Sequence, residues 1–187
     1  MTLKPFYLTR FPVTNKLNRK FLKATRHVKP DYWNNRKFNR DEQPEVGVSW
    51  DDAMAYCDWV TKTSKEKMKF CLPSEAEWEW AAGRGERKYP WGNEEPNHNR
   101  ANYDGKVGYP TPVGSYPSGA TPEGLMDMAG NVWEWCADWY DEKYKSIRVL
   151  QGGSWVSSGI NLRCWSRRRI SPDLRFDDVG FCVSCGA

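Results

Sequence analysis

The sequence predicts a single α+β domain with two main helices and much irregular coil. Its 187 residues suit one hydrophobic core, and its 11 Trp, 9 Tyr and 7 Phe can fill that core because each aromatic side chain buries a large area. Capped helical patterns are confined to the first half of the chain. The stretch from Tyr89 to Gly124 is rich in Gly, Pro and Asn and has little hydrophobic period, which predicts coil.

The first elements are a short strand and a helix. Residues Lys4 to Leu8 alternate and are aromatic, which is typical of a strand. Thr14 is a suitable N-cap, and apolar residues then recur at helical spacing: Leu17, Phe21 and Leu22. The polar stretch from His27 to Gln43, rich in Asn and Arg, is expected to be a loop.

Two more helices are predicted to begin at serine caps. Ser74 and Glu77 form a capping box, in which the serine accepts from the N3 amide and the glutamate reaches back to the cap amide. Pro73 before this box and Gly83 after it define a short buried helix. Ser49 precedes a longer helix with one apolar stripe, which we assign to the core: Trp50, Ala53, Met54, Cys57 and Val60.

The long coil after the third helix is expected to be ordered. A run of this length without regular structure is normally either disordered or functional. Aromatic residues occur at intervals along it, which favours loops packed onto a core: Tyr89, Trp91, Tyr103, Tyr109 and Tyr116. No internal repeat and no domain boundary is evident in the sequence.

Charge and hydropathy exclude two classes of partner. The formal net charge is only +4, and basic residues are interleaved with Asp and Glu, whereas a nucleic-acid-binding domain usually carries a one-sided excess. The sequence has no apolar run of about 18 residues, and its start, MTLKPFYLTRF, lacks the apolar segment of a signal peptide. We therefore expect no nucleic-acid partner, no membrane insertion, and a chain that is cytoplasmic at synthesis or exported without a cleaved signal.

The six cysteines do not match a zinc site. Only the last two form a CxxC motif, and the chain has 2 His to complete a four-ligand set. Buried thiols are therefore favoured over a metal site or disulfides. The cysteines are Cys57, Cys71, Cys136, Cys164, Cys182 and Cys185.

Asn131, Val132 and Glu134 form a candidate cation site. An amide oxygen, a backbone carbonyl and a carboxylate are hard oxygen ligands, which suit calcium rather than zinc. The alternative is structural, with Asn131 in a left-handed turn and Glu134 paired with a nearby arginine. Other chemistry lacks its templates, since the sequence has no GxSxG, no glycine-rich phosphate loop and no HExxH.

Four motifs follow one another along the chain: PVTNKLNRKFL, VSWDDAMAYCDWV, LPSEAEWEWAAGRG with YPWGNE, and GLMDMAGNVWEWCADWY followed by LQGGSW. In this order they resemble the formylglycine-generating-enzyme (FGE-sulfatase) family. The resemblance implies one C-type-lectin-like α+β domain over residues 1–187, with two main helices, small antiparallel sheets and much irregular coil. It also implies a structural calcium ion at GNVWEW, and it places the helix of Cys57 beside the C-terminal strand, close to Cys182.

The enzymes of this family, by the same resemblance, hold copper(I) between two cysteines five residues apart. Copper(I) needs soft thiolates, and a linear site needs two of them. Cys164 aligns with the second cysteine, but Gly159 stands at the position of the first. We therefore expect no copper and no catalysis, with Cys164 a buried or half-buried thiol. The alternative function is a copper-dependent formylglycine-generating-type oxidase or a related sulfoxide synthase-like enzyme.

The stretch from Val156 to Val179 resembles the variable region of diversity-generating-retroelement variable proteins, a branch of the same fold. In those proteins AAC codons are copied with errors, which yields Val, Ser, Ile, Arg, Leu, Phe and Asp but not Lys, Glu, Gln or Met. None of these last four occurs between Gly152 and Ala187, although Trp165 is an exception because AAC cannot yield Trp. The resemblance implies a viral or prokaryotic source and is compatible with a virion- or surface-associated protein.

We expect this stretch to be a ligand-binding surface. It has no helical or strand period, so the apolar side chains of Ile170, Leu174 and Phe176 are predicted to be exposed. The expected partner is another protein, of variable identity, because Trp, Phe and Arg are frequent hot spots of interfaces. The alternatives are an ordinary divergent loop and an adaptor domain of fixed sequence. The candidate binding residues are Val156, Ser157, Ser158, Ile160, Trp165, Ser166, Arg168, Arg169, Ile170, Ser171, Leu174, Phe176, Asp177, Asp178 and Val179.

Overall fold

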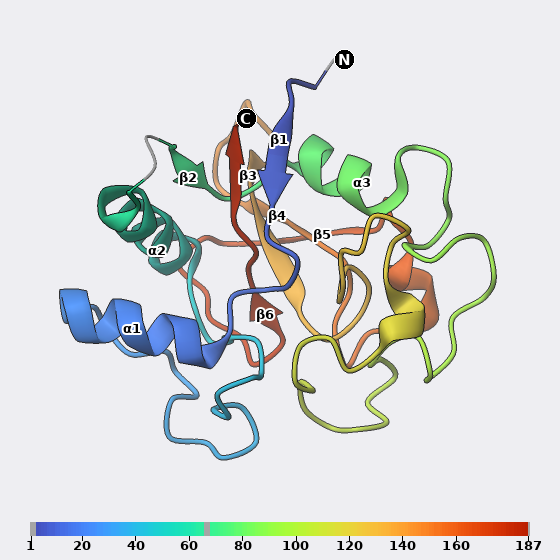
Figure 1. The fold of residues 1–187 in the computed structure, drawn as a ribbon, viewed down its shortest axis with the longest axis horizontal. Coiled ribbons are helices and arrows are strands. Elements are labelled where there is room, and N and C mark those ends of the chain that lie inside the picture. The colour runs from blue at the N-terminus through green and yellow to red at the C-terminus, as the bar shows by residue number, and fades with distance from the viewer. Residues whose placement is uncertain (1–2, 66–67, 187) are drawn as a thin grey trace.

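Three α-helices and two small β-sheets make up the main regular structure of the described residues, 3–65 and 68–186, in a computed structural model of the chain (Figure 1). The helices precede residue 84, and the larger sheet is built from residues after 132. Coil fills most of the stretch between them. The predicted α+β fold with small sheets and much coil is confirmed.

The smaller sheet joins the two ends of the described chain. Strand β7 (Ser184–Gly186) lies between β1 (Phe6–Leu8) and β2 (Phe70–Cys71), and both pairings are antiparallel. The N- and C-terminal ends therefore leave the molecule side by side (Figure 1). The strand predicted at the start of the chain is confirmed, with its observed bounds beginning at Phe6.

The larger sheet has the order β5-β4-β3-β6. Strands β3 (Trp133–Trp139), β4 (Arg148–Gln151) and β5 (Arg167–Ile170) are antiparallel neighbours, whereas β6 (Val179–Gly180) runs parallel to β3. This parallel pair is the one departure, among the described strands, from the expected antiparallel pattern. Strand β5 pairs with β4 and lies at one edge of the sheet.

All three helices begin at the residues that the sequence indicates. Helix α1 (Asn15–Thr25) is capped by Thr14, whose side chain accepts from the Leu17 amide. Helices α2 (Trp50–Thr63) and α3 (Glu75–Gly83) each begin with a complete capping box, formed by Ser49 with Asp52 and by Ser74 with Glu77. Helix α3 includes Gly83 and ends at Arg84, which adopts the left-handed conformation.

The coil between α3 and β3 is packed rather than loose, as predicted. Tyr89 and Tyr103 are buried in a small cluster that includes Leu162, and Trp91 stacks on Tyr89 with ring centroids 5.2 Å apart. One 3-10 turn, η1 (Pro117–Gly119), lies within it. A Cβ atom at Gly119 would stand 1.8 Å from the carbonyl oxygen of Arg100, so only glycine allows this close approach of two loop segments.

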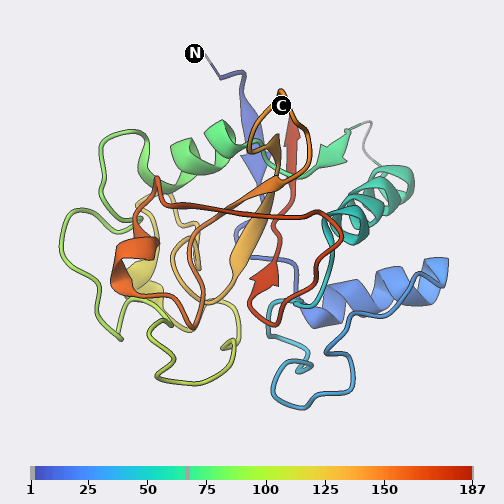
Figure 2. The same cartoon turned by 180° about the vertical axis from the view of Figure 1, so that it is seen from behind.

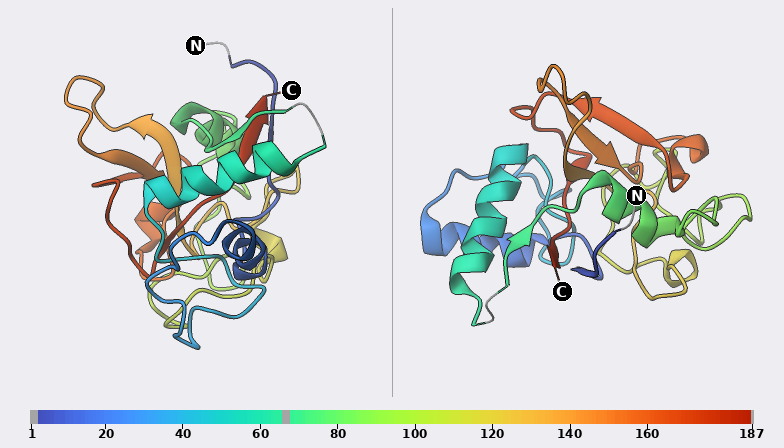
Figure 3. Two further views of the ribbon diagram at one scale, coloured as in Figure 1. Left: turned by 90° about the vertical axis from the view of Figure 1, so that its left-hand side faces the viewer. Right: turned by 90° about the horizontal axis from the view of Figure 1, so that it is seen from above.

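The main core lies where α1 and α2 cross against the sheets, while α3 packs on the other side of β7 (Figures 1 and 3). The apolar stripe predicted on α2 is confirmed, because Ala53 and Cys57 are buried and the other three members pack against the same cluster. Trp135 of β3 is fully buried there and donates its indole N–H to the Val48 carbonyl at 3.1 Å. In the described part of the chain, no helix has the length and hydropathy needed to cross a bilayer.

Glu45 introduces a buried carboxyl group beside this core. Its side chain is 2% exposed, and Oε2 has no hydrogen-bond partner among the described residues. Burial raises the pKa of Glu45 to about 7, against smaller opposing effects of a hydrogen bond to Asn18 and the charge of Arg19. Between pH 4.5 and about 7, Glu45 therefore keeps a proton in the folded state that it has already lost in the unfolded chain.

We expect Glu45→Gln to make stability less dependent on pH. The pKa of this carboxyl is raised on folding, so its favourable protonated form is present below pH 4.5 and is lost as pH rises through about 7. At pH 8 the ionised, buried group costs about 3 kcal/mol. Urea unfolding at pH 5 and pH 8 measures this: the wild type should lose more stability than the variant across that interval. An equal loss in both proteins would contradict the assignment.

Candidate functional site

The segment of residues 156–179 lies on one face of the molecule, where it supplies the edge strand β5 of the larger sheet (Figure 2, orange to red). It contains the 3-10 turn η2 (Gly159–Leu162) and strand β5, and it returns to the core at β6. Four of its large apolar side chains are exposed, with fractions of 51, 58, 53 and 42%: Val156, Ile160, Trp165 and Leu174. The exposure predicted for Leu174 is confirmed.

Other apolar candidates face inward, so the exposure predicted for Ile170 and Phe176 is wrong. Ile170 is the last residue of β5, pairs with Arg148 of β4, and is 9% exposed within the main core. Phe176 is half-buried against the same core, and Val179 of β6 is fully buried. Strand pairing gives the segment an inner and an outer side, which a short irregular sequence does not reveal.

The polar candidates also divide into two groups. Ser158 and Arg169 are exposed, and four others are half-buried: Ser166, Arg168, Ser171 and Asp177. Ser157 and Asp178 are buried, because they form a hydrogen-bonded cluster with Ser154. The Ser154 hydroxyl donates to Asp178 Oδ2 at 2.9 Å and lies 3.1 Å from Ser157 Oγ. This cluster fastens the beginning of the segment to its end.

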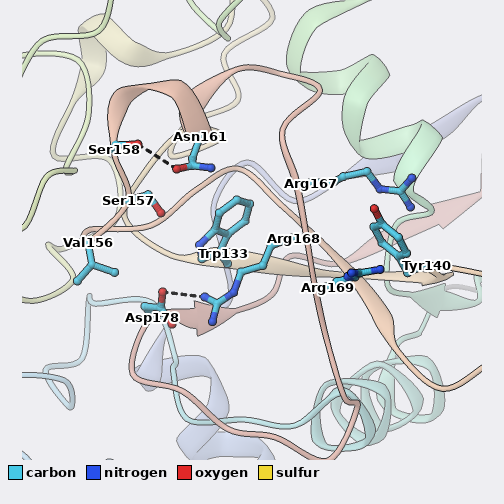
Figure 4. Close-up of a pocket in the computed structure, with 10 residues that line it drawn as sticks. All are labelled: Trp133, Tyr140, Val156, Ser157, Ser158, Asn161, Arg167, Arg168, Arg169 and Asp178. Carbon is cyan, nitrogen blue, oxygen red and sulfur yellow. Dashed lines mark hydrogen bonds and ion pairs between the residues drawn. The ribbon is translucent and has the colours of Figure 1, made fainter.

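An open cavity of about 540 Å³ lies on this face (Figure 4). We call it the arginine groove. Its walls come from β3, β5, η2 and the loops next to them, and its lining residues are Trp133, Tyr140, Val156, Ser157, Ser158, Asn161, Arg167, Arg168, Arg169 and Asp178. Six of these belong to the predicted binding set.

Three consecutive arginines give the groove its charge. Arg167 forms an ion pair with Glu75 of α3 at 2.8 Å, and Arg168 forms one with Asp178 at 3.1 Å. Arg169 is exposed and has no ion pair among the described residues. The guanidinium groups of Arg167 and Arg169 lie 4.0 and 4.9 Å from the ring centroid of Tyr140, so one aromatic ring orients both.

Sequence reasoning missed four of the lining residues. Trp133, Tyr140, Asn161 and Arg167 line the groove but are not among the predicted binding residues. Trp133 and Tyr140 lie more than fifteen residues before the segment, on or just after β3. They reach the groove because β4 pairs with both β3 and β5, which brings the three strands into one sheet. The alternation of β5 places Arg167 and Arg169 on one side of the strand, but its 4 residues are too few for the pattern to be recognised in the sequence.

Asn131 has a structural role in the candidate cation site. It adopts the left-handed conformation with φ 67° and is buried, as the alternative reading required. Its Oδ1 accepts the amide N–H of Thr111 at 2.9 Å, and its Nδ2 donates to the Thr111 carbonyl at 3.2 Å. These bonds clamp the preceding loop and occupy the amide oxygen that a cation would need. Val132 is fully buried, and it could offer a cation only its backbone carbonyl because its side chain has no donor atom.

Glu134 is better suited than Asn131 to bind a hard cation. Its hydrogen-bond partner differs from the arginine expected in the structural alternative. Its Oε2 accepts the indole N–H of Trp78 at 2.7 Å, rather than an arginine, and its buried Oε1 has no partner among the described residues. Burial raises the pKa of Glu134 to about 7, and the nearby carboxylate of Asp127 adds to the rise. Asp127 is half-buried, and desolvation raises its pKa to about 6. Two desolvated carboxylates within electrostatic range are what a calcium ion would neutralise.

Calcium binding at this place stays a prediction. The described residues contain no cluster of three or more His, Cys, Asp or Glu suited to a metal, so backbone carbonyls would have to complete the ligand set. We expect calcium at a hundredfold excess over Kd to stabilise the wild type by about 2.7 kcal/mol relative to EDTA, which is seen as a rise in melting temperature. Glu134→Gln should abolish the rise, whereas the matched Glu45→Gln should retain it. Identical melting curves with calcium and EDTA would contradict the prediction.

Cys164 is a buried thiol, as predicted. It is 5% exposed, and its Sγ would lie 2.9 Å from a Cβ atom placed on Gly83, so it packs tightly under the end of α3. Burial raises the pKa of Cys164 to about 12, which keeps it protonated. Gly159, five residues earlier, is the first residue of η2 and lies against Pro96 and Tyr103.

The cysteines remain thiols rather than forming disulfides, as expected. Five of the six are buried, and Cys71 is half-buried. Burial raises the pKa of Cys182 well above its usual range, and the charges of Glu134 and Cys57 contribute. Cys57 therefore lies within electrostatic range of Cys182, in agreement with the neighbourhood that the family resemblance implies.

Comparison with known proteins identifies the family. A family model described as a sulfatase-modifying factor enzyme 1-like domain matches residues 1–184. The serine/threonine-protein kinase Pkn1 of Chlamydia trachomatis is 36% identical over 97% of this chain, which spans 33% of that protein's length. The inactive C-alpha-formylglycine-generating enzyme 2 of Bos taurus is 33% identical over all of this chain and 79% of its own length.

Two solved structures share the fold over nearly the whole chain. PvdO from Pseudomonas aeruginosa superposes with a TM-score of 0.82 at 28% identity, covering 97% of this chain and 80% of that one. Treponema denticola variable protein 1 superposes with a TM-score of 0.80 at 25% identity, covering 97% of this chain and 84% of that one. With a family model that matches almost every residue, the chain belongs to the FGE-sulfatase family and has its C-type-lectin-like fold.

Proposed function

We propose that this chain is a non-catalytic ligand-binding protein, of a receptor or adhesion type, and that residues 156–179 present its binding surface. The observation that carries the proposal is the group of exposed apolar side chains on this segment: Val156, Ile160, Trp165 and Leu174. The segment that displays them is fastened by β5, β6 and the Ser154–Asp178 hydrogen bond. Irregular loops on a rigid scaffold can change their side chains at little cost to the fold.

The similarity to Treponema denticola variable protein 1 supports a diversified surface. That protein is described as variable, and the superposition covers 97% of this chain. We propose that a diversity-generating retroelement varies the exposed positions of the segment. The inactive formylglycine-generating enzyme 2 of Bos taurus supports the non-catalytic part, since it is a relative described as inactive.

The proposed partner is another protein. Trp165 and the arginines of the groove are residue types that dominate the energy of protein interfaces. We propose neither a nucleic-acid partner nor membrane insertion, because the net charge is only +4 and acidic residues are interleaved with the basic ones.

Sequencing of this gene across its source population, with its flanking DNA, tests the proposal. We expect changes at the exposed positions, such as Val156, Ser158, Ile160 and Leu174, and a template copy with AAC codons beside a reverse-transcriptase gene. Buried members of the same segment, such as Ile170 and Val179, serve as internal controls and should vary much less. One invariant sequence without a template copy would remove the diversification argument.

The alternative, a copper-dependent oxidase, has a separate test. At the place of the enzymes' copper site, this chain has one thiol, that of Cys164, which is buried and has a raised pKa. Gly159 offers no second sulfur ligand. Titration with copper(I) under reducing conditions should therefore show no stoichiometric site that depends on Cys164. Binding of one ion per chain that is lost in Cys164→Ser would restore the enzyme hypothesis.

A further inference from the structure

The arginine groove carries an excess of positive charge that the protein does not neutralise. Its lining contains three guanidinium groups, those of Arg167, Arg168 and Arg169, against the single carboxylate of Asp178. Glu75, outside the lining, pairs with Arg167. Arg169 is left exposed and without an acidic neighbour within ion-pair distance among the described residues. Each guanidinium has five N–H donors, so the two paired arginines also keep donors for a ligand.

The arginines are held in place before any ligand arrives. The Tyr140 ring lies against the guanidinium groups of both Arg167 and Arg169, and the ion pair with Glu75 fixes Arg167 to α3. Arg168 is held from the other side by Asp178, which the Ser154 hydroxyl anchors in turn. A guanidinium with restricted motion loses less entropy on binding, so this arrangement favours a ligand that meets several arginines at once.

The rest of the groove supplies neutral polar groups. Ser158 and Asn161 face one another across a hydrogen bond of 3.2 Å at one rim, and Val156 is exposed at another (Figure 4). No lysine lines the groove. Its charged donors are guanidinium groups, which are planar and can each bind a carboxylate through two hydrogen bonds. At about 540 Å³ the groove is wide enough for a few side chains of a partner rather than for one buried group.

We propose that the partner segment recognised by this surface is acidic, with two or more carboxylate side chains placed over Arg167, Arg168 and Arg169. The inference rests on the proposed ligand-binding function and adds the chemistry of the ligand. Carboxylates pair bidentately with guanidinium groups, and the excess positive charge attracts an acidic segment from a distance of about one Debye length. Because β5 is an edge strand, such a segment can approach the arginines without displacing another strand.

Selection from a displayed library of random peptides on the immobilised protein tests the proposal. Four proteins are compared: the wild type, Arg169→Glu, Val156→Trp and Arg36→Glu. Arg169→Glu reverses the unpaired charge, while Val156→Trp fills the groove without changing any charge. Arg36→Glu is the matched control, since Arg36 is exposed in the loop after α1 and does not line the groove.

The expected result is enrichment of peptides with several Asp or Glu residues on the wild type. Their affinity should fall by about tenfold or more in Arg169→Glu, fall in Val156→Trp, remain in Arg36→Glu, and weaken as salt is raised. A different result would overturn the acidic preference: enriched peptides that have no acidic excess and that bind Arg169→Glu but not Val156→Trp. The proposed binding surface would then still stand. If no enriched peptide responds to Val156→Trp, both the acidic preference and the proposed surface fail.

Discussion

Replacing Trp133 by alanine is expected to lower the free energy of unfolding by about 3–5 kcal/mol. Trp133 is 4% exposed at the start of β3, where it belongs to the main core and also forms the floor of the arginine groove. Its backbone pairs with Val179, and its amide N–H donates to the Asp178 carbonyl at 2.8 Å. The alanine variant would leave a large cavity exactly where the segment 156–179 is attached. Urea unfolding followed by intrinsic fluorescence measures the loss.

Trp155→Ala is the matched control for this prediction. The Trp155 side chain is only half-buried, and it lies 6.3 Å from Phe38 between ring centroids in a smaller cluster. Its indole N–H donates to the Asp177 carbonyl at 3.2 Å. We expect a clearly smaller loss than for Trp133→Ala, because less area leaves water on folding. A loss in Trp133→Ala as small as about 1 kcal/mol would contradict the placement of Trp133 in the core.

The second large effect is expected from Ile170. Ile170→Ala should cost about 2–5 kcal/mol, because the side chain fills the main core from the edge strand β5. Adding Phe176→Ala should increase the loss, since Phe176 packs against the same core. Leu174→Ala, from the same loop but 42% exposed, should change stability by less than about 1 kcal/mol. Thermal and urea unfolding of the three variants would reveal the difference, and a negligible effect of Ile170→Ala would contradict the burial.

The contrast between Ile170 and Leu174 shows where sequence reasoning reaches its limit. Both are isolated apolar residues among charges, four positions apart. What separates them is the pairing of Ile170 with Arg148, twenty-two residues earlier in the chain. Because β5 has only four residues, its alternation is too short to stand out from irregular sequence. The inner and outer sides of the segment are set by a distant strand, not by its own composition.

Local signals were sufficient for the helices. Caps depend on residues within three or four positions of one another, so Thr14, Ser49 and Ser74 could be identified directly. The overall fold could also be predicted, because the four motifs follow one another along the chain in a fixed order. The groove could be anticipated only in part, since Trp133 and Tyr140 approach Arg168 and Arg169 through the register of the larger sheet. Asp127 was missed although it lies in the same motif as Glu134, because the electrostatic contact between the two carboxyl groups depends on the turn that joins them.

The hydrogen bond between Ser154 and Asp178 has a consequence for how this protein can change over time. It closes a large loop whose two ends are held independently of what lies between them. The entropy of closing such a loop grows only slowly with its length, by about 0.6 kcal/mol for a doubling. Insertions and deletions at the exposed positions of this loop should therefore be tolerated better than changes at its buried positions, such as Leu162. The surface can vary in reach as well as in chemistry, which would let one scaffold follow partners of quite different shape.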